Sequence, residues 1–216
     1  MPIITISRQF GSGGSAIAER VATRLAWTLV DNEFVNRVAQ RADLPTDEVA
    51  RYEERVPSLL DRLARSLATS APDIMIAAPA DPGIPYAPER EIHKVTQAVI
   101  WEIVREDNAV IVGRGAQALL EHHRDALHVF VVAPRSTRVE RAAERLGQSH
   151  SQAERTVTDK DEGRRRYVEM FYHRSWDDPT HYHLVLNSGL LGYDVAADIV
   201  VAAARERGWP SPPASP

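Results

Sequence analysis

The start of the chain constrains its fold more than any other segment, because a β-branched run, a glycine-rich turn and a helical pattern follow one another there. The run Ile3-Ile4-Thr5-Ile6-Ser7 predicts a strand, and after a turn at residues 8–15 apolar residues recur at helical spacing from Ile17 to Leu25. Glycines in such a turn let backbone N–H groups converge at the positive end of the helix, which is typical of a phosphate cradle. The sequence therefore predicts a site for a nucleoside phosphate, the alternative being a glycine-rich turn with only a structural role.

The turn departs from the P-loop pattern G-x-x-x-x-G-K-[ST] at two positions. Alignment of the two places Arg8 at the first glycine and Gly14 at the lysine. The charge that lysine normally supplies must then come from elsewhere, and we expect Arg8 to supply it as a catalytic residue. Backbone cradling and Mg²⁺ coordination by the Ser15 hydroxyl are still expected. The expected cofactor-binding residues are Gly11, Ser12, Gly13, Gly14 and Ser15.

Length and composition exclude several classes of protein. A chain of 216 residues suits one domain with a sizeable core. The formal net charge of −4 at pH 7 argues against a general binder of nucleic acid or of membrane surfaces, which usually carry a basic excess. The absence of cysteine excludes disulfides, zinc–thiolate sites and thiol nucleophiles. No secretion signal and no apolar stretch of about 18 residues is recognisable, so a cytoplasmic protein is expected.

Strands and helices alternate along the rest of the chain. Alternation of this kind predicts an α/β fold with an open parallel sheet, whose ligands bind beyond the carboxyl ends of the strands. A proline-rich segment at residues 72–88 has no readable role. Strands are expected at 28–30, 109–112, 127–132 and 182–186, and helices at 33–41, 46–70 with a break at Pro57, 89–107, 135–146, 151–175 and 193–206.

Three arginine-bearing motifs accompany the loop. Gly113-Arg114-Gly115 follows a buried strand, where a guanidinium could bind a phosphate through two hydrogen bonds. Asp161 and Arg164 are three residues apart and share a helix face, so they could act together on a nucleotide. The third motif, Asp31-x-x-x-x-x-Arg37, follows the second short strand. The alternatives are a plain turn for the first motif, a solvated helix face for the neighbouring Arg165 and Arg166 of the second, and a capped surface helix for the third.

Further segments complete a combination of motifs that is specific as a whole. They are Val112-Gly113-Arg114-Gly115, Ala133-Pro134 with Arg138, Asp161-x-x-Arg164-x-x-Tyr167, and Trp176-x-Asp178-Pro179-x-x-Tyr182-x-Leu184-x-Leu186-Asn187-Ser188. With the loop, they resemble the cytidylate kinase-like family of P-loop proteins. The opening Ile6-Ser7-Arg8-Gln9-Phe10-Gly11-Ser12-Gly13-Gly14 looks like that family's ISR-x-[YF]-GSGG signature, in which the lysine is normally absent. The resemblance covers roughly residues 2–205 and is weakest over 40–90.

The resemblance implies a three-layer P-loop NTPase fold with a parallel central sheet, in a single domain over residues 1–208. An acceptor-binding helical insertion is expected at about 32–106 and a mobile helical lid at about 151–178. The proline-rich tail at 209–216 is expected to be disordered.

Roles transfer from cytidylate kinases position by position. Their loop binds the donor nucleotide and metal, which the resemblance gives to Gly11, Gly13 and Ser15. Their G-R-D motif implies that Arg114 holds the acceptor phosphate, but the aspartate that helps to read cytosine is replaced by Gly115. Without a partner for the base edge the site loses discrimination between bases, so the identity of the acceptor is left open.

The remaining roles come from two spaced pairs. The lid motif D-x-x-R implies a ribose contact for Asp161 and a phosphate contact for Arg164. The D-x-x-x-x-x-R motif makes Asp31 and Arg37 substrate-binding residues, with Arg37 as a second ligand of the acceptor phosphate.

The expected function is ATP-dependent phosphoryl transfer to a nucleoside monophosphate or a related small phosphorylated or hydroxylated acceptor. ATP and Mg²⁺ are the expected cofactors, and Arg8, Arg114 and Arg164 the expected catalytic residues, because phosphoryl transfer needs positioning and positive charge. The alternative is a nucleotide-binding regulatory module without turnover. The net charge gives little support to a regulator that binds RNA or DNA. A homodimer is possible on the sequence alone.

Overall fold

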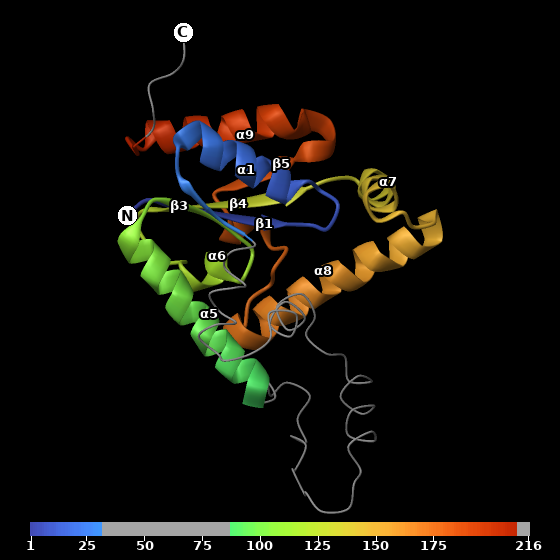
Figure 1. The fold of residues 1–216 in the computed structure, drawn as a ribbon, viewed down its shortest axis with the longest axis horizontal. Coiled ribbons are helices and arrows are strands. Elements are labelled where there is room, and N and C mark those ends of the chain that lie inside the picture. Colours follow the sequence, from blue (N-terminus) through green and yellow to red (C-terminus); the bar gives the residue numbers. More distant parts are fainter. Residues whose placement is uncertain (32–86, 211–216) are drawn as a thin grey trace, which may run out of the picture.

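The central sheet of the protein contains five parallel strands in the order β2-β3-β1-β4-β5 (Figure 1). The computed structural model describes residues 1–31 and 87–210, and the structural statements that follow concern these residues. All four residues of β3 are buried, as expected of an inner parallel strand that is covered on both faces. The strands are β1 (Ile3–Arg8), β2 (Thr28–Val30), β3 (Ala109–Val112), β4 (Ala126–Val132) and β5 (Leu184–Asn187). The predicted α/β class with a parallel sheet is confirmed.

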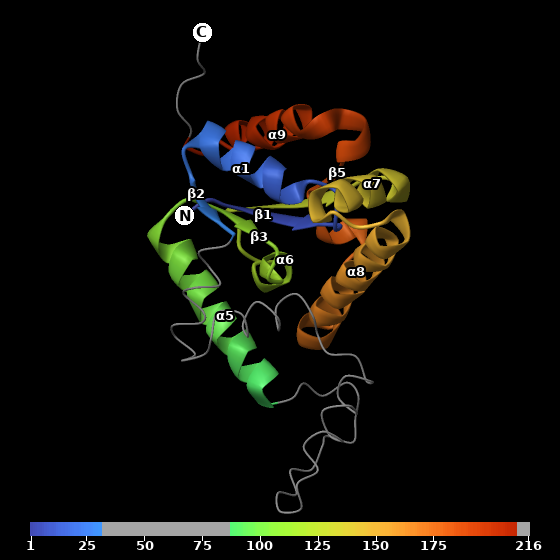
Figure 2. The ribbon, with the colours of Figure 1, turned by 45° about the vertical axis from the view of Figure 1, so that its right-hand side comes forward.

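Helices cover both faces of this sheet. The helices α1 (Gly14–Leu25) and α9 (Ser188–Glu206) lie side by side on one face, and α5 (Ala87–Glu106) and the short α6 (Ala116–Leu119) lie on the other (Figures 1 and 2). The alternation of side chains along β1 explains the two cores, because Ile4 and Ile6 pack with α1 and α9 while Ile3 packs with α5. Residues 87–106 of the expected acceptor-binding insertion are therefore a core helix of the sheet.

Two further helices form a hairpin beside the sheet. The helix α7 (Arg135–Leu146) packs against α8 (His150–Tyr172) through Val139, Ala142, Ala153 and Val157. A capping box at Ser149 and Gln152 starts α8, and the chain returns to β5 through the short 3-10 helix η1 (Pro179–His181). Most of the predicted lid segment 151–178 is therefore this one long helix, as its helical pattern indicated.

The last helix begins earlier than the sequence pattern indicated. The Asn187 side chain accepts a hydrogen bond from the N–H of Gly189 and starts α9 at Ser188. Gly192, with φ 75° and ψ 174°, then breaks the helix, so the predicted span 193–206 corresponds to its part after the kink. The predicted last strand at 182–186 is observed at 184–187.

The C-terminal segment begins packed against the domain. The rings of Trp27 and Trp209 lie 5.8 Å apart, and Trp27 Nε1 donates a hydrogen bond to the carbonyl of Pro210 at 2.8 Å. The first two residues of the segment 209–216 thus contact the body of the domain, whereas 211–216 lie outside the described residues.

Several predictions concern residues beyond the described regions. The expected helices at 33–41 and 46–70, Arg37 and most of the proline-rich segment lie outside them.

Over residues 1–31 and 87–210, no helix has the length and apolar character needed to cross a membrane.

Candidate functional site

The predicted site residues come from neighbouring strand ends. The loop at residues 8–15 ends β1, the turn at 113–115 ends β3, and Asp31 directly follows β2. Because Ile6 pairs with Val112 in the parallel register of β1 and β3, the loop and the turn leave the sheet side by side. The expected donor and acceptor motifs therefore share the carboxyl edge of the sheet, which is where ligands of such sheets bind.

The loop presents the amino terminus of α1 without a side-chain cap. Gly11 and Gly13 both have φ near 79°, a left-handed conformation that glycine adopts at little cost. Gly13 is the N-cap residue of α1 and provides no side-chain oxygen to the first N–H groups of the helix. These groups have no partner within the helix either, and together with the helix dipole they favour an anion. Ser15 lies exposed in the first turn.

Two serine hydroxyls hold the backbone of the loop by hydrogen bonds. Ser12 is fully buried, and its hydroxyl donates to the carbonyl of Gln9 at 2.8 Å. The Ser188 hydroxyl, at the start of α9, donates to the carbonyl of Ser12 at 2.5 Å. The Ser12 side chain therefore stabilises the conformation of the loop, and it is the backbone of the loop that is available to bind a ligand.

Arg8 extends from the loop toward the turn after β3. A Cβ atom built on Gly14 would overlap the Arg8 Cβ and lie 2.8 Å from its Cγ, so the stem of Arg8 passes directly over Gly14. A Cβ atom on Gly113 would overlap the Arg8 Nη1 and lie 3.0 Å from its Cζ. The guanidinium of Arg8 thus lies against the Gly113-Arg114-Gly115 turn, between the two motifs.

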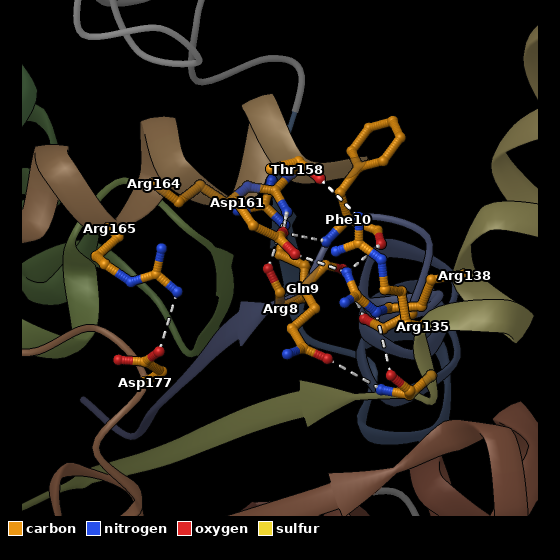
Figure 3. Close-up of polar contacts among 12 residues, drawn as sticks. Arg8, Gln9, Phe10, Arg135, Arg138, Thr158, Asp161, Arg164, Arg165 and Asp177 are labelled. Carbon is orange, nitrogen blue, oxygen red and sulfur yellow. Dashed lines mark hydrogen bonds and ion pairs between the residues drawn. The ribbon is translucent and has the colours of Figure 1, made fainter. Parts of the chain in front are cut away.

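A buried ion pair holds the loop to the α7–α8 hairpin (Figure 3). The Asp161 carboxylate accepts the Phe10 N–H at 2.7 Å and pairs with Arg138 at 2.6 Å, and the side chains of Asp161 and Arg138 are 13% and 8% exposed. Arg138 also donates to the carbonyls of Ala133 and Phe10. These three partners come from the ends of β1 and β4 and from α8, so the pair joins all three elements.

Arg164 also binds the loop. Its Nη1 donates to the Arg8 carbonyl at 2.9 Å, and its guanidinium lies 5.7 Å from the centre of the Phe10 ring (Figure 3). Asp161 and Arg164 do share one helix face, as their spacing indicated, with an N–O distance of 3.7 Å. Both contact the backbone of the loop, which neither the spacing nor the resemblance indicated. Their neighbours Arg165 and Arg166 pair with Asp177 and Glu162 at the surface.

The turn after β3 has an uncommon backbone. Gly113, Arg114 and Gly115 have φ values of 76°, 61° and 65°, so three successive residues are left-handed. This conformation is costly for Arg114, which has a Cβ, and such strain often occurs at functional sites. The turn fixes the direction in which the half-buried Arg114 leaves the strand.

A family model matches residues 3–190 of the chain, and it describes the cytidylate kinase-like family. The chain belongs to this family. A cytidylate kinase of Halobacterium salinarum is 25% identical over 205 residues, which cover 93% of this chain and 88% of the relative.

Solved structures share the fold at lower identity. An uncharacterized protein from Eubacterium ventriosum is 20% identical, with a TM-score of 0.69 and coverage of 96% of this chain and 100% of that one. A shikimate kinase from Bacteroides thetaiotaomicron is 13% identical, with a TM-score of 0.53 and coverage of 94% and 98%. Together with the parallel sheet, these neighbours identify the predicted P-loop kinase fold.

Aromatic rings fill the space beside Gly115, the position at which the resemblance to cytidylate kinases implies a cytosine-reading aspartate. A Cβ atom on Gly115 would overlap the ring of Tyr172, with Cζ at 3.1 Å, and would lie 3.2 Å from Tyr167 Cε1. His93 of α5 stacks on Phe171 at 4.0 Å, and its Nδ1 is 3.0 Å from the Tyr167 hydroxyl. Burial lowers the pKa of His93 to about 4 and raises the pKa of Tyr172, so both are neutral at pH 7.

Sequence reasoning missed this aromatic cluster (His93, Tyr167, Phe171 and Tyr172), and it gave Arg138 no role. The spacing of Tyr167 and Phe171, four residues apart on one helix face, was a readable signal. Tyr193 was also missed: a Cβ atom on Gly13 would lie 2.5 Å from its Cζ, and the Arg141 guanidinium lies 4.8 Å from its ring centre. The Gly192 kink places this ring against the loop.

Proposed function

We propose that this protein transfers the γ-phosphoryl group of ATP to a small phosphorylated or hydroxylated acceptor. One observation carries the proposal: an uncapped helix N-terminus and an arginine-bearing turn leave adjacent strands of one sheet, side by side. The first can hold the phosphates of a donor and the second the phosphate of an acceptor. The family and the kinase fold support this type of reaction.

The donor would bind the loop through its backbone. The N–H groups at the start of α1 and the glycines at 11 and 13 would surround the phosphates of ATP. The exposed Ser15 hydroxyl would hold Mg²⁺ together with phosphate oxygens, and the ion when bound neutralises phosphate charge. Among the described residues there is no acidic or histidine cluster for a metal, which fits an ion held mainly by the nucleotide.

The acceptor would bind opposite the loop. Arg114 would hold its phosphate, and Asp31 at the end of β2 would contact the same molecule, with Arg37 as the predicted second phosphate ligand. Transfer forms a bond from an acceptor oxygen to the γ-phosphorus while the bond to the bridging oxygen of ADP breaks, and a hydroxyl acceptor also releases its proton to water. Arg164 is already held beside the loop, and we propose that it stabilises the charge of this transition state.

The site fits poorly to recognition of cytidylate through an aspartate that reads the cytosine base. An aspartate side chain at position 115 would need the space of Tyr172 and Tyr167. The rings of Tyr167 and Tyr172 bring no carboxylate to this place, so the contact with which an aspartate reads a base edge is lost. The proposed acceptor class therefore comprises other nucleoside monophosphates and small phosphorylated or hydroxylated metabolites.

The decisive experiment measures ADP formation with Mg²⁺ and ATP over a panel of nucleoside monophosphates, sugar phosphates and hydroxylated acids. We expect ADP to form with at least one acceptor, and Arg114→Gln to raise the KM of that acceptor more than the KM of ATP. The exposed Arg124→Gln is the matched control and should change neither. An Arg114→Gln variant with unchanged acceptor KM would contradict the assignment.

A second function is a nucleotide-binding regulatory module without turnover. Two observations favour it: Gly14 stands at the lysine position, and Asp161 and Arg164 bind the loop backbone. ATP binding without ADP formation for any acceptor would select this function. A cytoplasmic location and a homodimer stay predictions.

A further inference from the structure

Glycine at position 14 is explained by space and not by conformation. Gly14 is the first residue of α1, and its φ lies outside the left-handed region in which glycine is needed. Glycine is among the weakest helix formers, and no positive φ requires it at the first position of α1, so its presence there has another reason. The reason is the stem of Arg8, which a Cβ at position 14 would overlap. The lysine position of the loop is therefore occupied by the side chain of another residue.

Arg8 runs from that position to the acceptor motif. Its Cβ and Cγ lie over Gly14 and its Cζ lies near Gly113, so two glycines, one from each motif, border the same side chain. The backbone of Arg8 is fixed by its register opposite Val131 of β4 and by the hydrogen bond from Arg164. A positive charge thus lies at the boundary between the donor loop and the acceptor turn.

A guanidinium suits this place better than an ammonium group would. Its planar fork can contact two oxygens of different groups, whereas lysine carries a compact charge. Between the two motifs, such a fork can contact the transferred phosphoryl group together with the acceptor or the leaving oxygen.

We propose that Arg8 is a catalytic residue that performs the task of the P-loop lysine from the opposite side of the same niche. The niche (the space bordered by Gly14 and Gly113) accommodates one long cationic side chain, either from position 8 or from position 14, but not both. This inference rests on the proposed phosphoryl transfer for its catalytic part, while its steric part concerns the fold alone.

The test compares five proteins: the wild type, Arg8→Ala, Arg8→Gly, Gly14→Lys and the double variant Arg8→Gly/Gly14→Lys, in which position 8 has no Cβ to overlap the lysine stem. We expect Arg8→Ala to lower kcat/KM for ATP by about 10²-fold or more, as loss of one well-placed donor does. Gly14→Lys in the wild type should lower both the melting temperature and the activity, because the two side chains collide. In the double variant the lysine should restore at least tenfold of the activity lost in Arg8→Ala, and the melting temperature should be no lower than that of Arg8→Gly.

One control variant and the pattern of outcomes separate the possible failures. Arg165→Ala removes a surface arginine paired with Asp177 and should leave every readout unchanged. A double variant that folds but is no more active than Arg8→Ala, or a Gly14→Lys variant as stable as the wild type, would overturn the inference. Wild-type protein without ADP formation would overturn the proposed function instead. The niche is then tested by ATP affinity measured calorimetrically, which should fall in Arg8→Ala and recover in the double variant.

Discussion

Removal of the Asp161 carboxylate is expected to destabilise the domain strongly. Asp161→Ala breaks an ion pair whose side chains are 13% and 8% exposed, and it leaves the Arg138 guanidinium buried. Loss of one partner of a buried pair costs about 3–5 kcal/mol. The lower end applies here, because Arg138 keeps its hydrogen bonds to the carbonyls of Ala133 and Phe10. We therefore expect the free energy of unfolding to fall by about 3 kcal/mol.

The adjacent residue provides a matched control. Glu162 pairs with Arg166 at 3.0 Å on the same helix, but these side chains are 48% and 46% exposed. An exposed pair at this spacing contributes about 0.3–0.5 kcal/mol, so Glu162→Ala should change the unfolding free energy very little. Two ion pairs of similar length thus differ about sixfold or more in expected cost, and burial is the cause.

Urea unfolding followed by circular dichroism measures both variants under the same conditions. Asp161→Asn belongs in the series, because an amide oxygen can still accept the Phe10 N–H while the charge is lost; it should lie between the wild type and Asp161→Ala. The reasoning is refuted if Asp161→Ala costs less than about 1 kcal/mol while the Kd for ATP rises. Asp161 would then be the ribose ligand that the family resemblance implies.

Further predictions concern three other places in the fold. Gly115→Asp should lower the melting temperature, because its Cβ overlaps the Tyr172 ring, and it should create no activity with cytidylate in an ADP assay; a stable, cytidylate-active variant would contradict the aromatic filling of the site. Burial holds the pKa of His93 at about 4, so the unfolded chain, with a pKa near 6.5, takes up the proton first as the pH falls. The stability contributed by neutral His93 is complete above about pH 6.5 and is lost toward pH 4, by about 2 kcal/mol at pH 5 in urea titrations, and His93→Asn should flatten this dependence. Trp209→Ala removes the ring packed on Trp27 and should lower the melting temperature without changing ATP affinity; an unchanged melting temperature would show that this contact contributes nothing.

Apolar and β-branched patterns in the sequence predicted the strands and most of the helices, because these elements depend on neighbouring residues. The β-branched run before the loop and the apolar run at 109–112 are the observed β1 and β3, since burial on both faces leaves a plain signature. The start of α9 was missed because its first turn depends on a side-chain cap and its pattern is broken by a single glycine. Helix periodicity placed Asp161 and Arg164 on one face.

The partners of these site residues could not be predicted in the same way. Asp161 binds Phe10 and Arg138, which are 151 and 23 residues away, and no spacing within α8 encodes those contacts. The contacts at Gly115 likewise require the end of α8 to lie against the turn after β3. The roles of Arg8, Arg114 and Arg164 stay predictions, and Arg37 lies outside the described residues.

The strand order distinguishes the connection that follows β2 from the donor loop in its tolerance to evolutionary change. β1, which carries the donor loop, is bonded on both sides, to β3 and to β4, so an insertion within it would disrupt two ladders. β2 is an edge strand, and the chain leaves the sheet there at Asp31 and rejoins the described fold at Ala87. Lengthening or exchange of the chain between these points breaks no pairing among the five described strands. On the predicted acceptor-binding role of that connection, descendants of one ancestor can acquire new acceptors by remodelling it while they inherit the donor loop unchanged.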